Sequence, residues 1–323
     1  MKITILGAGA YALALASMIK ENKHEITIWT KLQTELEELE INHTNNRALP
    51  GYIMPSDIKY TMDLKKAVSD SELIIFAIPT DFIDDVAKDL SNYYTHQHIC
   101  IASKGIEQDT CLFADDVINK YIKTDKMAVI SGPSFASDII KKVPIGLSLA
   151  TKNNETASIV INALQNKYLK LRMTDDIVGI EICGSIKNVI AIASGIIVGM
   201  GLPESTQAMF ITESLHDIKE LIKALGGNKT TILSFAGFGD LLLTATSIKS
   251  RNFKLGKMIG EKQSKDLITD YINNTTIEGL YTLKSIYKLL HNKKVDIPII
   301  DLIYDIIFKD KDPEEIKDFL IKK

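Results

Sequence analysis

The sequence Gly7-Ala8-Gly9-Ala10-Tyr11-Ala12 decides the fold class of this chain. It directly follows the apolar run Lys2–Leu6 and leads into the helical pattern Ala12–Lys20. The first glycine permits a tight turn, and the second lets the backbone approach a pyrophosphate, which then lies on the helix N-terminus. Ala12 stands at the third position, which the relaxed form of the motif allows. In this context the motif predicts a dinucleotide site, with a glycine turn that binds no ligand as the alternative.

Short apolar runs alternate with helical patterns through the first half of the chain. Helical patterns such as Ala12–Lys20 and Phe82–Leu90 lie between the apolar runs. The predicted strands are Lys2–Leu6, Glu25–Trp29, Leu73–Ile78, His98–Ala102 and Met127–Ile130. Alternation of this kind predicts an α/β domain of the Rossmann type, with a mostly parallel sheet and helices on both faces.

After about residue 178 only helical patterns remain. The predicted helices are Ile182–Gly199, Ser205–Leu225, Asp240–Thr246, Asn252–Ile259, Ile277–Leu290 and Ile299–Phe308. No Pro-rich or Ser-rich linker marks the change of pattern. We therefore expect a Rossmann domain over residues 1–178 that binds NAD(P), followed by an all-α substrate and catalytic domain over residues 179–323.

The composition is that of a globular protein with no bias toward polyanions. The chain has 323 residues and a formal net charge of −3, which makes nucleic acid a poor candidate partner. Cys100, Cys111 and Cys183 form no Cys-x-x-Cys pair, which argues against structural zinc and against a disulfide framework. The N-terminal apolar run lacks the features of a signal peptide. We expect a cytoplasmic protein that needs no metal ion.

The apolar segment Ile182–Gly199 is nearly long enough to span a membrane. Lys187 and Asn188 lie together near its first third, where polar groups in a bilayer are costly. We therefore expect a buried central helix and no integral membrane segment.

The end of the second predicted strand bears on the choice of cofactor. An NAD-specific site usually has Asp or Glu there for the ribose hydroxyls, whereas this chain has Trp29-Thr30-Lys31. Thr30 and Lys31 are suited to a 2′-phosphate, so NADPH is expected to bind well. The alternative is that Lys31 is a solvated surface side chain. NADP(H), NAD(H) or both are therefore the predicted cofactors.

Polar groups follow two later strands of the predicted sheet. Ser103-Lys104-Gly105 follows one strand, and Ser131-Gly132-Pro133-Ser134 follows the next. Because open parallel sheets bind ligands beyond the carboxyl ends of their strands, these loops predict an anion pocket. The alternative for each is a surface loop with solvated side chains.

Lys187 stands almost alone among the apolar residues of its predicted helix. A buried ammonium group is costly unless it is paired, and desolvation lowers the pKa of a lysine. Lys187 is therefore a candidate general acid and base, with a lysine that reaches solvent at the helix edge as the alternative.

A later segment supplies a carboxylate and an anion clamp. Asp240, after Gly237-Phe238-Gly239, is suited either to steady a catalytic lysine or to cap a helix. Ser250-Arg251-Asn252 opens the next predicted helix, and arginine is suited to bidentate recognition of phosphate.

Together these motifs resemble the bacterial-type NAD(P)-dependent glycerol-3-phosphate dehydrogenase family, in order and over nearly the whole chain. The motifs that carry the resemblance are Gly7–Ala12, Ser103-Lys104-Gly105, Ser131–Ala136, Glu181–Asn188, Gly237–Thr246, Ser250-Arg251-Asn252, Ile277-Glu278-Gly279 and Pro298-Ile299. The sequence Ser-Gly-Pro-Ser-Phe-Ala over 131–136 and the block 237–252 are not general Rossmann features.

The resemblance implies reversible hydride transfer between NAD(P)H and dihydroxyacetone phosphate, giving sn-glycerol 3-phosphate for glycerophospholipid synthesis. The implied catalytic residues are Lys187, which exchanges the proton, Lys104, which polarises the carbonyl, and Asp240, which orients the substrate and Lys187. With the glycines of the turn, the cofactor-binding set is Gly7, Gly9, Ala10, Tyr11, Lys31, Lys104, Ala136, Arg251, Thr276 and Glu278. The substrate-binding set is Lys104, Gly132, Ser134, Lys187, Asn188, Asp240, Ser250, Arg251 and Asn252. The family also implies a homodimer.

Four positions depart from the family pattern. Ala10 and Ala12 replace the serine and the glycine that usually flank the aromatic residue of the fingerprint. Family members usually carry Asn near Glu204, and Arg at the position of Glu213. The reversed charge at Glu213 bears on a local ion pair or on the subunit contact, and so on the support around Lys187.

Two other interpretations stay open at this point. A β-hydroxyacid dehydrogenase of the 6-phosphogluconate type has a similar architecture, but its Lys-x-x-Asn pattern differs from the adjacent Lys187-Asn188. A non-catalytic NADPH sensor is the alternative from another class. Such a sensor has little need for Lys104, Lys187, Asp240 and Arg251 together.

Overall fold

The computed structural model describes residues 1–322, which divide into two compact units. Unit 1 comprises Met1–Lys104 and Ala114–Ile177, and unit 2 comprises Gly105–Phe113 and the chain from Val178 onward. The expectation of two uninterrupted domains did not include the excursion over Gly105–Phe113. That segment is tied to unit 2 by hydrogen bonds from Ser285 Oγ to the Ile106 carbonyl (3.3 Å) and from Lys288 Nζ to the Asp109 carbonyl (2.9 Å).

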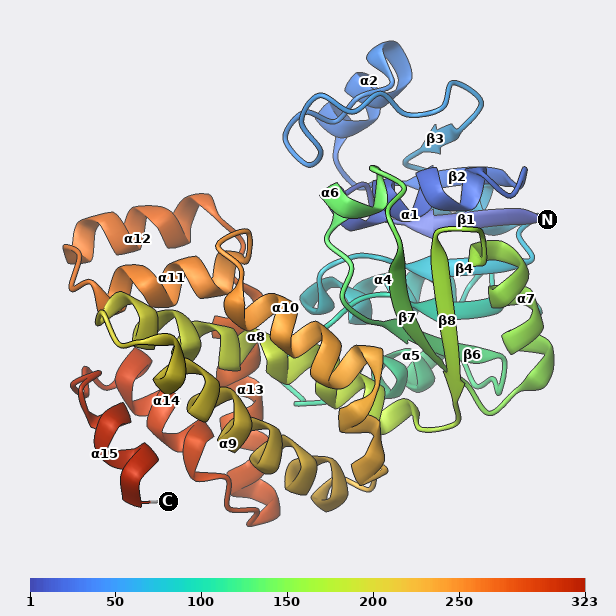
Figure 1. The fold of residues 1–323 in the computed structure, drawn as a ribbon. Coiled ribbons are helices and arrows are strands. Elements are labelled where there is room, and N and C mark those ends of the chain that lie inside the picture. The colour runs from blue at the N-terminus through green and yellow to red at the C-terminus, as the bar shows by residue number, and fades with distance from the viewer. Residues whose placement is uncertain (323) are drawn as a thin grey trace. The chain divides into compact units, whose positions relative to one another are not determined.

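Unit 1 is built on an eight-stranded sheet in the order β3-β2-β1-β4-β5-β6-β7-β8 (Figure 1). The strands are β1 (Lys2–Leu6), β2 (Glu25–Trp29), β3 (Lys59–Thr61), β4 (Leu73–Phe76), β5 (His98–Ile101), β6 (Met127–Ser131), β7 (Ile145–Ala150) and β8 (Leu169–Thr174). Every neighbouring pair is parallel except β6 and β7, which are antiparallel. The predicted mostly parallel sheet of Rossmann type is confirmed.

The central strands are continuous apolar runs because both faces of the sheet are covered. Every residue of β4 and of β5 is buried. The helices of unit 1 are α1 (Ala10–Lys20), α2 (Gln33–Asn42), α3 (Leu64–Val68), α4 (Ile83–Leu90), α5 (Ala114–Tyr121), α6 (Ala136–Ile139) and α7 (Asn154–Leu164), with a 3₁₀ turn, η1 (Thr80–Phe82), before α4. Helix α1 contacts α6 and α7, whereas α4 contacts α5. Since right-handed connections run from β1 toward β2 and from β4 toward β5, α1 and α4 cover opposite faces.

The strand order reverses between β1 and β4, which is where such sheets bind their ligands. The glycine turn after β1 lies at this point. Gly7 has a φ of +116°, and a Cβ atom there would lie 2.6 Å from the Ala77 carbonyl oxygen that follows β4. Only glycine fits this turn, which places the N-terminus of α1 at the switch point.

Unit 2 is all-helical apart from its turns. Its helices are α8 (Ile177–Gly199), α9 (Glu204–Ala224), α10 (Asp240–Thr246), α11 (Arg251–Gly260), α12 (Lys265–Asn274), α13 (Glu278–Lys293), α14 (Pro298–Phe308) and α15 (Glu315–Lys322). A 3₁₀ turn, η2 (Lys229–Leu233), and a π-helical turn, η3 (Phe235–Gly239), precede α10. In Figure 1, α11 and α12 lie side by side, as do α13 and α14.

Helix α8 forms the core of unit 2. Within residues 1–322 it is the one helix long and apolar enough to cross a membrane, but 89% of its most apolar stretch is buried inside the structure. This agrees with the central helix expected from the position of Lys187 and Asn188.

Glycines bring the backbones of α8 and α11 into contact. A Cβ atom on Gly195 would lie 2.1 Å from the Phe253 carbonyl oxygen, and one on Gly256 would lie 1.8 Å from the Ile192 carbonyl oxygen. Gly199 and Gly260 continue the same contact one helical turn further along. The seam between the two helices therefore fixes the start of α11 against the middle of α8.

Candidate active site

The glycine turn leaves the N-terminus of α1 open for an anion. Gly9 is the N-cap of α1, and neither a side-chain cap nor an acidic residue occupies the first turn. A Cβ atom added to Gly9 would meet no atom within 4 Å, so no other segment of the chain crowds this side of the turn. The backbone N–H groups of the first turn and the helix dipole favour a phosphate there. These features fit the pyrophosphate of a dinucleotide.

Asn45 holds the glycine turn from the loop after α2. Its side chain is 1% exposed, and its Nδ2 donates to the Ala8 carbonyl oxygen at 3.0 Å. Its Oδ1 accepts from the Ala48 backbone N–H at 3.1 Å, so both ends of the amide are bonded. Reasoning from the sequence missed this residue, because an asparagine in a polar loop carries no distinguishing pattern.

Tyr11, Lys104 and the loop after β6 form one cluster in unit 1. Ser134 Oγ donates to the Gly132 carbonyl at 3.0 Å, so the hydroxyl of Tyr11, 3.2 Å from Ser134 Oγ, is the donor in that pair. Lys104 Nζ lies 5.7 Å from the centre of the Tyr11 ring, within the range of a cation–π contact. The strand-end loops thus place a cation and two hydroxyl groups together, as an anion pocket requires.

The remaining predicted cofactor residues of unit 1 lie around this cluster. Ala10 is the first residue of α1, and Ala136 opens α6, which packs on α1. Lys31 is exposed just beyond β2. Thr30, which we expected to receive a 2′-phosphate, is only 3% exposed, and its hydroxyl donates to Glu35 Oε2 at 2.6 Å. That hydroxyl is therefore already engaged within the protein.

The lysine singled out in the apolar helix is buried and paired in unit 2. Lys187 Nζ lies 2.6 Å from Asp240 Oδ1, and the two side chains are 10% and 2% exposed. A carboxylate at this distance compensates the ammonium charge that burial disfavours. Thr244, one turn along α10, donates its hydroxyl to the Asp240 carbonyl oxygen at 2.6 Å.

A π-helical turn sets the position of Asp240. The turn η3 immediately precedes α10, and the Ser234 hydroxyl accepts from the Gly237 N–H at its start. A Cβ atom on Gly237 would lie 2.2 Å from the Ile232 carbonyl oxygen. Turns of this kind are rare and occur often at functional sites. This one aims Asp240 at α8.

Two buried asparagines connect three helices of unit 2. Asn252 Nδ2 donates to Asn188 Oδ1 at 3.0 Å, and Asn252 Oδ1 accepts from the Gly279 N–H at 2.9 Å. Asn188 Nδ2 donates to Glu278 Oε2 at 3.1 Å. The start of α11 and the start of α13 are thereby bonded to the residue next to Lys187.

The anion clamp predicted at the start of α11 has one exposed member. Ser250 is buried and caps the helix, since its hydroxyl accepts from the Phe253 N–H at 3.2 Å. Arg251 follows it as an exposed residue in the first turn of α11, and Thr276 is exposed before α13. Arg251 is therefore placed to present its guanidinium to a ligand in solution.

The structure brings together part of each predicted set within its own unit. The cluster in unit 1 contains Tyr11, Lys104, Gly132 and Ser134. The network in unit 2 contains Lys187, Asn188, Asp240, Asn252 and Glu278. No group of three or more His, Cys, Asp or Glu side chains suited to a metal ion occurs among residues 1–322.

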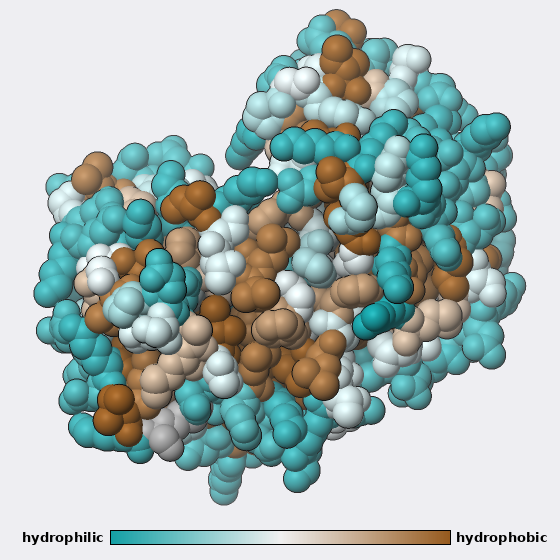
Figure 2. All heavy atoms as spheres, viewed as in Figure 1, coloured by the Kyte–Doolittle hydropathy of each residue, from teal (hydrophilic) through white to brown (hydrophobic). Residues whose placement is uncertain are grey.

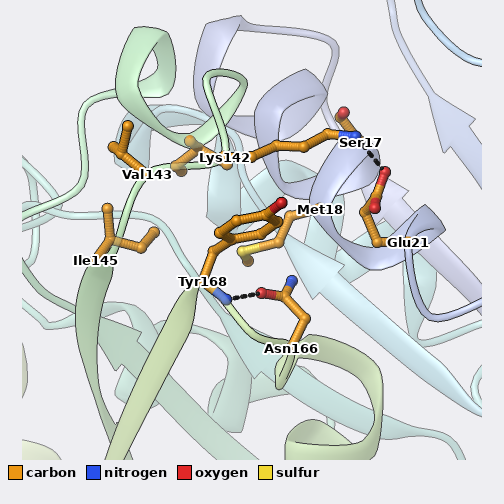
Figure 3. Close-up of a pocket in the computed structure, with 9 residues that line it drawn as sticks. Ser17, Met18, Glu21, Lys142, Val143, Ile145, Asn166 and Tyr168 are labelled. Carbon is orange, nitrogen blue, oxygen red and sulfur yellow. Dashed lines mark hydrogen bonds and ion pairs between the residues drawn. The ribbon is translucent and has the colours of Figure 1, made fainter.

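A small pocket elsewhere in unit 1 is lined by none of the predicted site residues. It lies against the C-terminal half of α1, and an ion pair of 2.7 Å between Lys142 and Glu21 crosses its rim (Figure 3). Its lining residues are Ser17, Met18, Glu21, Ile139, Lys142, Val143, Ile145, Asn166 and Tyr168. It has room for about one water molecule, too little for a substrate. The glycine turn lies at the other end of α1.

A Rossmann sheet with an open glycine turn, joined to a helical unit that buries a lysine–carboxylate pair, defines a dinucleotide-dependent dehydrogenase. Two family models match the chain: the N-terminal part of NAD-dependent glycerol-3-phosphate dehydrogenase over residues 2–157, and its C-terminal part over residues 176–318. The chain belongs to the NAD-dependent glycerol-3-phosphate dehydrogenase family.

Similar proteins cover the chain from end to end. The glycerol-3-phosphate dehydrogenase [NAD(P)+] of a Staphylococcus epidermidis strain is 35% identical over 96% of this chain and 94% of its own length. That of a Staphylococcus aureus strain is 34% identical over 99% of this chain and 97% of its own. The crystal structure of glycerol-3-phosphate dehydrogenase from Coxiella burnetii aligns with a TM-score of 0.94 at 30% identity, over 100% of this chain and 99% of its own. The family resemblance found in the motifs is confirmed.

Proposed function

We propose that this protein catalyses the reversible reduction of dihydroxyacetone phosphate to sn-glycerol 3-phosphate with NAD(P)H. Membership of the family supplies the reaction class. The observation that carries the proposal is the buried pair of Lys187 and Asp240, whose atoms lie 2.6 Å apart. A buried ammonium group held by a carboxylate, beside further bonded polar groups, suits proton transfer better than it suits packing.

Unit 1 is proposed as the NAD(P)-binding domain, and unit 2 as the substrate and catalytic domain. The pyrophosphate of the cofactor would lie on the first turn of α1, at Gly9 and Ala10, with Tyr11 beside it. Lys104 would contact cofactor and substrate. Ala136, Arg251, Thr276 and Glu278 complete the proposed cofactor set, with Lys31 near the ribose.

The bound nicotinamide ring would supply or accept the hydride, which is the part of the chemistry that belongs to the cofactor. Lys187 would donate a proton to the carbonyl oxygen during reduction, and would accept it back from the hydroxyl during oxidation. Asp240 would hold the ammonium group in place and keep it charged until the transfer. Lys104 would draw electron density from the same carbonyl.

The phosphate of the substrate is assigned to Arg251, supported by Ser250 and Asn252. Arg251 is the exposed member of that trio, and its planar fork matches phosphate oxygens in pairs. Gly132, Ser134 and Asn188 are proposed to bind substrate as well. The bonds from Asn188 to Glu278 and from Asn252 to Asn188 fix the orientation of its amide and leave one N–H and one oxygen lone pair for such a contact.

The direct test is the absorbance of NADH or NADPH in the presence of purified protein and dihydroxyacetone phosphate. We expect rapid decay of the signal that depends on the phosphorylated ketone, and no decay with unphosphorylated dihydroxyacetone. Retained cofactor binding without turnover of dihydroxyacetone phosphate would overturn the proposal.

The setting of this reaction is also proposed. We expect a cytoplasmic enzyme that supplies sn-glycerol 3-phosphate for glycerophospholipid synthesis and acts as a homodimer. Figure 2 shows apolar atoms gathered over α10 and the turns before it, where Leu233, Phe238 and Leu242 are exposed. Exposed apolar groups of this kind support self-association. Sedimentation at micromolar concentration should give the mass of two chains.

A further inference from the structure

A carboxylate is held at the end of β2, where the sequence Trp29-Thr30-Lys31 offers none. Glu35, in the first turn of α2, accepts a hydrogen bond of 2.6 Å from the buried hydroxyl of Thr30. The same hydroxyl accepts from the Leu32 N–H at 3.3 Å, which fixes its direction. Only Oε2 of Glu35 takes part in this bond, and no partner of Oε1 is found among residues 1–322.

This carboxylate lies beside the glycine turn. Trp29 is the last residue of β2 and pairs with Leu6, and the Gly7 N–H donates to the Trp29 carbonyl at 2.8 Å. Thr30 and the turn therefore leave neighbouring strands at the same edge of the sheet. In dinucleotide-binding folds the adenosine ribose lies between these two points, and an acidic side chain after the second strand binds its hydroxyls.

The charges near Glu35 favour a ribose with a free 2′-hydroxyl. A carboxylate accepts hydrogen bonds from ribose hydroxyls, whereas a 2′-phosphate would bring nearly two negative charges against it. Lys31, which directly follows Thr30, is exposed, so water and salt weaken its attraction for a phosphate. Leu32, 47% exposed at the start of α2, provides no charge.

We propose that Glu35, positioned by Thr30, selects NAD(H) over NADP(H) in this protein. This preference rests on the proposed function in one respect, which is that the protein binds a nicotinamide dinucleotide. It reverses the preference suggested by Thr30 and Lys31, because Thr30 serves to hold a carboxylate rather than to receive a phosphate.

The chain itself provides a probe of this subsite. Trp29 is the single tryptophan, is 5% exposed and adjoins Thr30, so its fluorescence should respond to ligands of the adenosine subsite. Titration with 5′-AMP and with adenosine 2′,5′-bisphosphate measures discrimination at the ribose without any turnover. Titration with NADH and NADPH then measures it for the whole cofactor. We expect 5′-AMP and NADH, which lack the 2′-phosphate, each to bind more tightly than its 2′-phosphorylated counterpart, by about tenfold or more.

Two variants separate the charge from its position. Glu35→Gln keeps the shape and can still accept from Thr30, and it should tighten binding of the 2′-phosphorylated ligands about tenfold while weakening NADH severalfold. Thr30→Val keeps the charge but frees it, and should reduce the discrimination without reversing it. Glu37→Gln, at an exposed position of the same helix where the carboxylate accepts a hydrogen bond from Gln33, is the matched control and should leave both affinities unchanged.

The binding experiments test the cofactor preference separately from the dehydrogenase activity. Equal or tighter binding of the 2′-phosphorylated ligands by the unaltered protein would overturn the inference, as would an unchanged preference in Glu35→Gln. Loss of discrimination in Glu37→Gln as well would show a diffuse charge effect and would also overturn it. Failure to reduce dihydroxyacetone phosphate, with discrimination between the two ligands retained, would refute the proposed function alone.

Discussion

Lys187 is proposed to act in catalysis, and its pairing with a carboxylate offsets the free-energy cost of burying its charge. Its partner Asp240 is 2% exposed, and the pair is held between α8 and α10. In Lys187→Met we expect kcat to fall by about 10²–10⁴-fold, the usual contribution of general acid–base catalysis, while NADH binding stays within twofold. Steady-state kinetics and a fluorescence titration check this. A kcat within tenfold of the original would remove Lys187 from the proton-transfer step.

Removal of the lysine also strands a buried carboxylate. We expect Lys187→Met to lower the free energy of unfolding by about 3–5 kcal/mol, because the buried Asp240 carboxylate loses the ammonium group that is paired with it. The double variant Lys187→Met/Asp240→Asn should recover much of that loss in urea unfolding and none of the turnover. Recovery of turnover together with stability would mean that the pair acts only in folding.

Arg251 should affect substrate binding more than chemistry. Arg251→Ala removes charge-assisted bonds to phosphate, worth about 1.5–3 kcal/mol, so KM for dihydroxyacetone phosphate should rise roughly tenfold to a hundredfold. Arg251→Lys keeps the positive charge but loses the planar pair of donors. Its KM for dihydroxyacetone phosphate should lie between those of the original protein and Arg251→Ala. An unchanged KM in both variants would argue against the clamp.

At the scale of residues, the sequence predicted which side chains have a chemical role better than it predicted their hydrogen-bond partners. The isolation of Lys187 in an apolar helix identified a buried cation, and of the two roles open to Asp240 the structure shows the pairing with that lysine. The use of Ser250 as a helix cap and the bonds that join Asn188 to Asn252 depend on how helices meet. No spacing along the chain encodes those contacts. The same holds for Asn45 and the glycine turn.

The contact between α8 and α11 is an element-scale feature with a measurable cost. Gly256→Ala would place a Cβ atom 1.8 Å from the Ile192 carbonyl oxygen, so the two helices must separate. We expect a loss of about 1–3 kcal/mol or more in urea unfolding. A lower affinity for substrate should accompany it, because Asn252 moves with α11.

Lys254→Ala, at an exposed position of the same helix, is the control for that experiment. It should change the unfolding free energy by no more than about 0.5 kcal/mol. If Gly256→Ala behaves in the same way, the close approach of the two helices does not contribute to stability.

Helices and strands with a clear pattern of apolar residues were predicted well. Strands that are recognised only by their pairing with neighbouring strands were not. The strands β1 and β2 and the helix α10 have the predicted bounds. Strand β8 was missed because it is an edge strand with mixed polarity and half-exposed residues. Strand β7 was missed because Gly146 and Ser148 interrupt its apolar run, although it is almost entirely buried and lies between β6 and β8. Strand β3, three residues long, is too short to show a pattern.

Stability of the whole molecule should depend on pH through one buried histidine. His98 is 4% exposed at the start of β5, and its Nδ1 bonds to Thr156 of α7. Burial holds the pKa of His98 below its usual value, and Lys126 and His96 add to this, against the opposing effect of Glu155 and Asp125. Between the ordinary histidine pKa of about 6.5 and the lower pKa of the folded state, the unfolded chain therefore binds a proton that the folded chain does not.

It follows that stability is retained above the ordinary histidine pKa and declines as pH falls from about 6.5 toward the lower pKa of the folded state. The slope due to one proton is at most about 1.4 kcal/mol per pH unit. Urea unfolding at pH 7.5 and 5.5 should show this decline, and His98→Gln should flatten it. An equal decline in that variant would assign the effect to other groups.

The excursion over Gly105–Phe113 has a consequence for how this chain can be divided. The chain passes from one unit to the other three times, after Lys104, Phe113 and Ile177. A single cut near residue 177 therefore yields a fragment that carries nine residues of its neighbour (105 to 113), and a second fragment that lacks them. Recombination in evolution meets the same obstacle, because one crossover cannot exchange either half intact. We therefore expect the nucleotide-binding and helical parts to be inherited together.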